Sequence, residues 1–266
     1  MTQRVLILGG SEPYPNAPVL AALGALRGGA GLLTLAVPEA SLSAASAWVP
    51  EAMRRVLPVG QDGSVSADAL ERTHTDINAF DAVVIGPGLT RQPSASALLS
   101  NVLSTYAGRL VIDADALAML PSAGAANAPA VQARIITPHP GEAALLAGKT
   151  VGEIQADRLT AVRGPAERYA SAAVLKGAGT LVCGPGGVPA LNLTGNPGMA
   201  TGGTGDVLAG LAAALWASGG SAFSAAKAAV WAHGTAGDLA ALQEGETALS
   251  ATSLAARLGQ ALRLLG

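Results

Sequence analysis

The hydrophobic residues of this chain form short runs that alternate with longer stretches of helical spacing. The short runs are mostly bounded by Gly, Pro or Asp and show no regular polar alternation. Strands that lack polar alternation are covered on both faces, which is typical of a parallel sheet. The expected strands are Val5–Leu8, Leu32–Val37, Ala82–Ile85, Leu110–Ile112, Arg134–Ile136, Ala173–Leu175 and Thr180–Cys183.

The stretches between and after these strands predict helices. They are Ala17–Arg27, Pro93–Thr105, Gly141–Ala147, Ile154–Ala172, Asp206–Ala217, Ala222–Gln243 and Ser250–Leu264. The alternation predicts an α/β fold with a mostly parallel central sheet and helices on both faces. We find no linker and no repeat, so residues 1–266 are expected to form a single domain, with an Ala- and Gly-rich surface loop at 121–129.

The composition argues against several classes of protein. The 266 residues are 3% aromatic and carry a net charge of -2, so we expect no nucleic-acid partner. The most apolar helix candidates are interrupted by Gly, Ser or a charge before ~18 residues, so no membrane span is expected. Cys183 is the single cysteine, which excludes an internal disulfide and favours a reducing compartment such as the cytoplasm.

The strongest chemical signal is a glycine-rich segment before the first helix of the last third. Gly202, Gly203 and Gly205 allow the backbone to turn its N–H groups inward. The start of a helix beneath such a loop attracts anions, which predicts an anion hole at Gly202, Gly203, Thr204 and Gly205. Asp206 in the first turn can take a proton from a substrate hydroxyl as it attacks phosphorus. The alternative is an ordinary N-cap aspartate.

Three further glycine-rich turns follow expected strands. Gly9–Ser11 lacks the full G-x-G-x-x-G spacing, so a tight turn explains it as well as a dinucleotide site does. Ile85–Leu89 contains Gly-Pro-Gly, which lets a ligand approach the backbone or simply makes a turn. Lys176–Thr180 places a cation where it can meet phosphate, or forms a hairpin turn.

Carboxylates and a histidine follow two other expected strands. Asp113 and Asp115 can face one site or one Mg²⁺, although one of them can instead cap the next helix. His139 lies between two prolines in an extended loop, where substrate contact is the favoured interpretation. Glu142, in the first turn of the next helix, completes the candidate metal ligands. His233, inside an Ala-rich helix, is expected to be packed or hydrogen-bonded to a neighbour.

These segments, in this order, resemble the ADP-dependent NAD(P)H-hydrate dehydratase family of the ribokinase-like superfamily. The sequence GGTGD alone indicates only the superfamily, but its combination with HPGE and KGAGT is much more specific. The resembling segments cover nearly the whole chain: Leu8–Pro38, Ile85–Leu89, Val111–Leu117, Thr137–Glu142, Val174–Thr180, Leu193–Gly210 and Ala229–Ala240.

The resemblance implies roles for individual residues. Ala17, Gly88 and His139 resemble contacts to the hydrated nicotinamide dinucleotide, and Asp206 resembles a residue at the hydrate. The implied adenine-nucleotide contacts are Lys176, Gly177, Ala178, Gly179, Thr180 and Gly205. In the implied reaction ADP phosphorylates the ring hydroxyl of the S-epimer, and phosphate leaves as the double bond forms. NADH or NADPH is restored, with AMP and phosphate as products. Mg²⁺ and a homotetramer are implied as well.

The sequence departs from the family pattern at its start. Family members usually carry a helix and a Lys-Gly-containing stretch before the first strand, so we expect that contact to be absent or replaced. Bifunctional relatives also carry an epimerase domain, so a separate epimerase is the expected partner. The nearest rival function is a ribokinase-like kinase for a vitamin precursor such as hydroxymethylpyrimidine or hydroxyethylthiazole. A nucleotide-binding protein without turnover is a rival of a different class.

Overall fold

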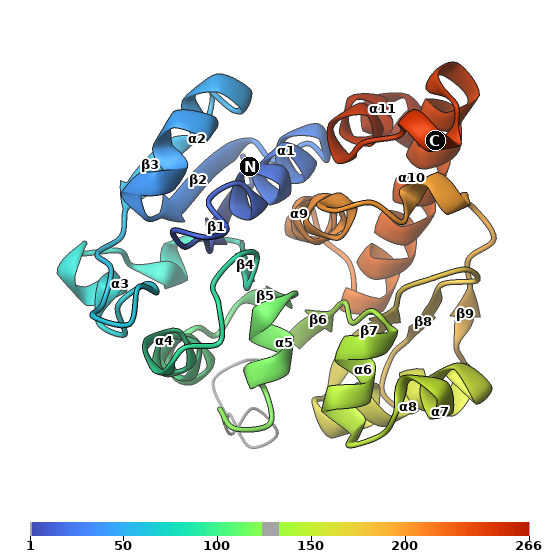
Figure 1. Cartoon of the computed structure of the whole chain (residues 1–266), viewed down its shortest axis with the longest axis horizontal. Coiled ribbons are helices and arrows are strands. Elements are labelled where there is room, and N and C mark those ends of the chain that lie inside the picture. The colour runs from blue at the N-terminus through green and yellow to red at the C-terminus, as the bar shows by residue number, and fades with distance from the viewer. Residues whose placement is uncertain (1, 124–132, 266) are drawn as a thin grey trace.

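A sheet in the order β3-β2-β1-β4-β5-β6-β7-β8-β9 forms the centre of the molecule (Figure 1). The structure is a computed structural model that describes residues 2–123 and 133–265. Its strands are β1 (Arg4–Leu8), β2 (Leu32–Val37), β3 (Met53–Val56), β4 (Ala82–Ile85), β5 (Arg109–Ile112), β6 (Ala133–Ile136), β7 (Ser171–Leu175), β8 (Leu181–Cys183) and β9 (Ala190–Leu191). Neighbours from β3 through β7 pair in parallel, whereas β8 and β9 pair antiparallel.

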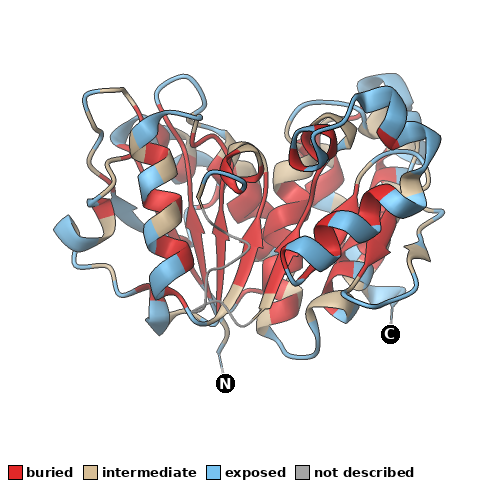
Figure 2. Cartoon of the chain, turned by 90° about the horizontal axis from the view of Figure 1, so that it is seen from below, coloured by how far each residue is buried: buried red, intermediate tan, exposed pale blue. Residues whose placement is uncertain are grey.

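Helices cover both faces of this sheet. They are α1 (Ala17–Arg27), α2 (Leu42–Trp48), α3 (Ala69–Arg72), α4 (Pro93–Thr105), α5 (Asp115–Met119), α6 (Pro140–Ala147), α7 (Val151–Ala156), α8 (Arg158–Arg168), α9 (Thr204–Ala217), α10 (Ala222–Glu244) and α11 (Ala251–Arg263). One face carries α1, α9, α10 and α11, and the other carries α4, α5, α6 and α8. Figure 2 shows the buried sheet between these layers. The predicted α/β architecture is confirmed.

Strand β1 shows how the sheet divides the core in two. Val5 and Ile7 pack with α1 and α9, whereas Leu6 and Leu8 pack with α4 and α5. Successive side chains of a strand point to opposite faces, and all four of these are fully buried. Each buried aliphatic side chain contributes about 1.5–3 kcal/mol. The unbroken apolar run thus follows from a sheet that is covered on both sides.

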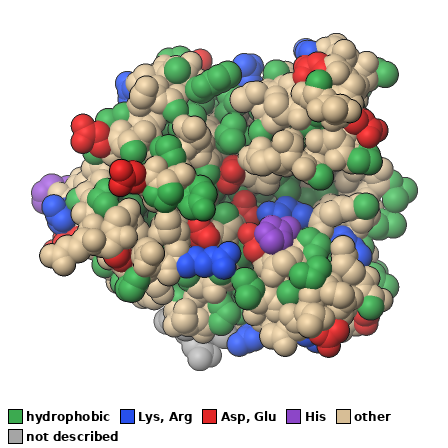
Figure 3. All heavy atoms as spheres, in the orientation of Figure 1, with side chains coloured by type: hydrophobic (Ala, Val, Ile, Leu, Met, Phe, Trp, Pro, Cys, Tyr) green, Lys and Arg blue, Asp and Glu red, His purple; other side chains and the backbone are tan. Residues whose placement is uncertain are grey.

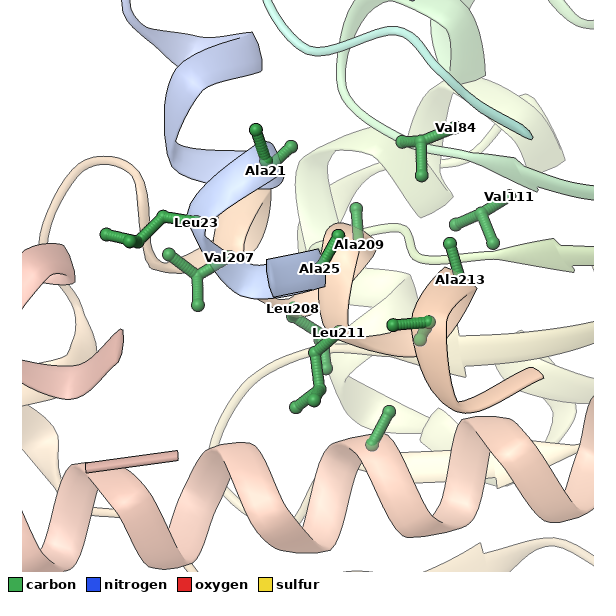
Figure 4. Close-up of a cluster of buried hydrophobic side chains, with 14 of the residues drawn as sticks. Ala21, Leu23, Ala25, Val84, Val111, Val207, Leu208, Ala209, Leu211 and Ala213 are labelled. Atoms are coloured by element: carbon green, nitrogen blue, oxygen red, sulfur yellow. The ribbon is translucent and has the colours of Figure 1, made fainter. Parts of the chain in front are cut away.

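Helices α1 and α9 pack closely against each other. Figure 4 shows their small and aliphatic side chains in one cluster. A Cβ added at Gly24 would lie 2.1 Å from the carbonyl oxygen of Val207, and one added at Gly210 would lie 1.7 Å from that of Ala21. Only glycine allows the two backbones to approach this closely.

The expected helix Ile154–Ala172 is wrong in its extent. The helical stretch breaks after α7, and the side chain of Asp157 accepts the N–H of Thr160 to start α8. The chain then enters β7 at Ser171. A side-chain cap in the middle of a continuous helical pattern therefore divides it.

The other expected elements lie within two residues of the observed ones, but some elements were not expected. β3 has the sequence MRRV and is exposed throughout, so it lacks the apolar run by which the other strands were found. β9 has only two residues. Most of the expected surface loop at 121–129 lies outside the described residues. No helix within the described ranges combines the length and the hydropathy needed to cross a bilayer.

Candidate active site

Most of the predicted site residues converge at one edge of the parallel strands. Asp113 follows β5, Thr137 follows β6 and Lys176 follows β7. These three strands are adjacent and parallel, so their carboxyl ends meet at the same edge, where α/β proteins bind ligands. Figure 3 shows acidic, basic and histidine side chains gathered around a hollow in this face of the molecule.

Asp113 is the centre of a buried polar cluster. Its side chain is 2% exposed. Its Oδ1 accepts hydrogen bonds from Oγ1 of Thr137 at 2.7 Å and from Nζ of Lys176 at 3.0 Å. The same Nζ lies 3.7 Å from Oε2 of Glu142. Burial alone would lower the pKa of Lys176, but the two carboxylates outweigh it and the pKa is raised, so the ammonium group stays charged.

His139 and Glu142 form a capping box at the start of α6. Nδ1 of His139 accepts the N–H groups of Gly141 and Glu142 at 3.0 and 3.2 Å, and Oε2 of Glu142 accepts the N–H of His139 at 2.7 Å. Burial, followed by the charge of Lys176, lowers the pKa of His139, which favours the neutral ring. Because Nδ1 accepts hydrogen bonds, the proton of that ring lies on Nε2. The His139 side chain is 55% exposed, so its ring is open to a ligand.

Glu142 itself is held in the cluster. Its side chain is only 7% exposed. Burial raises the pKa of its carboxyl to about 7; Lys176 opposes the shift and Asp113 adds to it. The carboxyl therefore changes charge near neutral pH.

α9 begins at Thr204 without a side-chain cap. Gly203 precedes it with φ 89°, a conformation that favours glycine. The hydroxyl of Thr204 donates to carbonyl oxygens of the preceding loop. No described residue accepts the N–H of Gly205 or Asp206. Free N–H groups at the positive end of a helix dipole are suited to bind an anion.

Asp206 stands in this first turn. Burial raises the pKa of its carboxyl to about 8; Asp113 adds to this shift and Lys176 opposes it. A carboxyl with a pKa near the working pH is suited to accept a proton from a reacting hydroxyl.

The start of α9 meets the polar cluster at Gly205. A Cβ added there would lie 3.2 Å from Nζ of Lys176 and 4.0 Å from Oδ2 of Asp113. The ammonium group of Lys176, for which the sequence left open a phosphate contact or a place in a turn, therefore lies between the carboxylate cluster and the helix start.

The segment Lys176–Thr180 connects β7 to the antiparallel β8. It is therefore a hairpin turn, which was one of the two interpretations that the sequence allowed. Gly177 has φ 125° and Gly179 has φ 63°, both in the region that favours glycine. The turn and the predicted nucleotide contact are compatible, since the same loop starts at the polar cluster.

Gly88 and Ala17 lie next to each other. A Cβ at Gly88, whose φ is 70°, would lie 3.2 Å from Cβ of Ala17 and 2.5 Å from the carbonyl oxygen of Tyr14. At Gly86 a Cβ would lie 1.8 Å from the carbonyl oxygen of Asp113. The Gly-Pro-Gly turn thus joins the predicted substrate contacts to the polar cluster.

Asp115 has partners different from those of Asp113. Its carboxylate accepts the N–H of Thr90 at 3.0 Å and Nε of Arg91 at 3.1 Å. These contacts give no support to a Mg²⁺ shared by the two aspartates. Within residues 2–123 and 133–265, no group of three His, Cys, Asp or Glu side chains is arranged to hold a metal ion.

Two residues of the site were missed from the sequence, and a third was anticipated. Thr137 directly follows a strand, which is the signal that could have found it. Arg158 gives no such signal, because it lies on a separate helix and donates to backbone carbonyl oxygens.

His233 makes the hydrogen bond to a neighbour that the sequence led us to expect: its Nε2 lies 2.8 Å from the carbonyl oxygen of Thr204. Burial lowers the pKa of His233 to about 4, so its ring is neutral and Nε2 donates.

A cavity of about 660 Å³ lies at the other end of the sheet. It is lined by Arg4, Leu32, Thr34, Met53, Arg54, Arg55, His74, Thr75, Asp76, Ala79 and Phe80. These residues belong to β1, β2, β3 and the segment before β4, and none is a predicted site residue. The predicted site residues whose pKa values are shifted meet instead at the carboxyl edge.

The sequence has relatives of named activity. The chain is 40% identical to the bifunctional NAD(P)H-hydrate repair enzyme Nnr of Moorella thermoacetica, a match that covers 98% of this chain and 49% of that protein. It is 37% identical to the ADP-dependent (S)-NAD(P)H-hydrate dehydratase of Xanthomonas campestris, covering 88% of this chain and 79% of that one. The chain spans about half the length of the bifunctional relatives that it matches.

Solved structures share the fold. The ADP/ATP-dependent NAD(P)H-hydrate dehydratase from Bacillus subtilis, co-crystallised with ATP and Mg²⁺, has a TM-score of 0.85 and 29% identity, covering 99% of this chain and 90% of that one. A ribokinase-like superfamily protein from Enterococcus faecalis has a TM-score of 0.84 and 27% identity, covering 98% and 87%. The predicted ribokinase-like fold is thus confirmed. Residues 5–259 match the family described as NAD(P)H-hydrate dehydratase, and the chain belongs to that family.

Proposed function

We propose that this chain catalyses the ADP-dependent dehydration of the S-epimer of NAD(P)H hydrate. The products are NAD(P)H, AMP and phosphate. The observation that carries the proposal is the joint position of Asp206 and the uncapped start of α9, with Nζ of Lys176 beside Gly205. Membership of the dehydratase family supports it.

The site divides into two parts. The hydrated dinucleotide would contact Ala17, Gly88 and the exposed ring of His139. The adenine nucleotide would lie along 176–180. Its transferred phosphoryl group would face the N–H groups at 202–205.

The chemistry consists of two steps. The ring hydroxyl of the hydrate attacks the β-phosphorus of ADP, the bond from that phosphorus to AMP breaks, and Asp206 takes the hydroxyl proton. The resulting phosphate is a better leaving group than hydroxide. The ring nitrogen donates its lone pair as the carbon–oxygen bond breaks, and loss of a proton from the neighbouring carbon completes the double bond.

A Mg²⁺ ion fits this site only together with oxygen atoms of the nucleotide. Asp113 and Glu142 already face Lys176, and no three-ligand group is present among the described residues. Mg²⁺ is commonly held by one or two carboxylates plus phosphates and water. Asp113 and Glu142 would be those carboxylates, and the bound ion would neutralise charge on the phosphates.

An assay of the purified chain tests the proposal. The S-epimer of NADH hydrate (S-NADHX) is incubated with the chain and ADP, and in parallel with ATP. The near-ultraviolet absorbance of NADH is expected to return. With ADP, AMP and phosphate are expected in equal amounts. A vitamin-precursor kinase would instead convert hydroxymethylpyrimidine or hydroxyethylthiazole to a stable phosphate ester. Binding of ADP without turnover of any of these substrates would contradict both enzyme functions.

Three further expectations belong to the same proposal. A homotetramer is proposed from the family resemblance, and sedimentation of the purified chain tests it. A cytoplasmic location is proposed because the single cysteine, Cys183, is buried and free. The proposed reaction takes only the S-epimer, so mixed epimers should be only partly consumed by residues 1–266 when no epimerase is added.

A further inference from the structure

The loop Lys176–Thr180 is held from outside by one guanidinium group. Arg158, the first residue of α8, donates from Nη2 to the carbonyl oxygens of Leu175 at 3.1 Å, Lys176 at 3.3 Å and Gly179 at 3.3 Å. Its Nη1 donates to Oε1 of Gln155 at 2.7 Å. The planar fork thus bonds the start and the far side of the loop at once.

The guanidinium lies directly beside the first glycine of the loop. A Cβ added at Gly177 would be 3.5 Å from Nη1 and 3.7 Å from Nη2 of Arg158. Turning three carbonyl oxygens toward one point brings like partial charges together, and the positive charge of Arg158 offsets this cost. Arg158 therefore favours a loop conformation that the glycines permit but do not by themselves impose.

Fixing the carbonyl groups also fixes the N–H groups. In a trans peptide the carbonyl of one residue and the N–H of the next point in opposite directions. The carbonyls of Lys176 and Gly179 face Arg158, so the N–H groups of Gly177 and Thr180 point away from it. The N–H of Thr180 faces the carbonyl of Gly177 across the turn formed by Ala178 and Gly179. No described residue accepts the N–H of Gly177, which is therefore a donor that the loop offers to a ligand.

We propose that Arg158 is a positioning residue for the nucleotide: by holding the carbonyl of Lys176 it aims the N–H of Gly177 at the nucleotide, and it does not touch the nucleotide itself. The inference rests on the proposed nucleotide site. The transferred phosphoryl group is assigned to the start of α9, so the loop holds the part that ADP and AMP share. Both amino groups of the Arg158 fork are already bonded to protein, which distinguishes this role from a direct phosphate contact.

Calorimetric binding of ADP and of AMP, at matched salt, tests this role. Arg158→Gln is expected to raise the Kd of both nucleotides by a similar factor of about ten, because charge-assisted hydrogen bonds that order the loop are lost. Arg158→Lys, which keeps the charge but lacks the fork, should recover only part of the affinity. The matched control is Arg163→Gln on the same helix, which is exposed and lies outside the loop contacts; it should leave both Kd values unchanged.

Kinetics separate positioning from a general structural role. In Arg158→Gln the KM for ADP should rise about tenfold, while the KM for the hydrate and kcat at saturating ADP stay within about twofold. Gln155→Ala removes only the residue that orients Nη1 and should raise the KM for ADP about threefold. If Arg158→Gln fails to fold, Gln155→Ala still tests the positioning role, since Gln155 is exposed and lies outside the loop.

The outcomes distinguish this inference from the proposed function. A loss confined to ADP would mean direct contact with its β-phosphate and would overturn the positioning role, as would an unchanged Kd in Arg158→Gln. If the wild-type protein dehydrates the hydrate and Arg158→Gln binds ADP as tightly as wild type, the positioning role is refuted and the proposed function stands. If the wild-type protein binds ADP, Arg158→Gln binds it weakly and neither protein turns over the hydrate, the proposed function is refuted and the positioning role stands.

Discussion

Two helices start at the same edge of the sheet, and only one of them is closed by its own residues. At α6 the ring of His139 and the carboxylate of Glu142 satisfy the first backbone N–H groups in a capping box. At α9 the N-cap position is Gly203, and no side chain caps the helix. The two helix dipoles are equivalent in kind, but only α9 has free donors for a ligand.

The difference suits the two helix starts to separate tasks in the proposed reaction. α6 uses its donors internally, so the exposed edge of His139 would be open to the substrate while Glu142 stays buried. α9 has no side-chain cap, so its donors would be open to phosphate, with Asp206 beside them. Lys176 lies between the two, near Glu142 on one side and Gly205 on the other. The phosphoryl group is therefore expected at α9 and not at α6.

The largest effect is expected from Asp206→Asn. The amide cannot take the hydroxyl proton, so kcat should fall about a thousandfold, with nucleotide affinity changed far less. Single-turnover assays with S-NADHX and ADP measure this directly. Asp68→Asn, an exposed aspartate in the N-terminal half, is the control and should match wild type. Turnover of Asp206→Asn at the parent rate would remove the proposed base.

Gly205→Ala tests how tightly α9 and Lys176 are fitted together. The new Cβ would lie 3.2 Å from Nζ of Lys176, so the ammonium group must move. A misplaced charge near the transferred group should lower kcat/KM about a hundredfold. Alanine is the better helix former, so the free energy of unfolding should not fall.

Gly259→Ala in α11 has open space around its new Cβ and serves as the control. It should raise stability by up to about 1 kcal/mol without any change in activity. Equal activity in Gly205→Ala and wild type would show that Lys176 does not act at the start of α9.

The pH profile gives an effect of similar size. Asp206 accepts the proton only when it is ionised, and its pKa is raised to about 8 by burial, with Asp113 adding to the shift. The ionised fraction therefore falls as pH drops below 8, and kcat/KM should be about fiftyfold lower at pH 6 than at pH 8. A kcat/KM that stays constant from pH 6 to pH 8 at fixed salt concentration would contradict a base with this pKa.

The sequence placed the start of α9 to within two residues, because the glycine spacing and the position of Asp206 are local signals. It did not predict that Asp113 and Asp115 have separate partners, since this depends on Arg91 approaching from another loop. Arg158 was missed for a similar reason: its partners are backbone carbonyls distant in sequence. The single helix expected over Ile154–Ala172 is wrong because Asp157 caps the start of a new helix inside it. This cap leaves the spacing of the apolar residues nearly unbroken, so the spacing does not reveal the break.

The smallest effect is expected at His139, where two substitutions separate capping from substrate contact. His139→Ala removes the acceptor for the N–H groups of Gly141 and Glu142 and should lower the free energy of unfolding by about 1 kcal/mol. His139→Asn supplies a short side chain that caps well, so stability should return to near the wild-type value. Neither variant has the exposed ring, so both should raise the KM for the hydrate severalfold, with the KM for ADP unchanged. If His139→Asn restored the hydrate KM along with stability, the ring would have no part in binding, and α6 would serve only as the closed counterpart of α9.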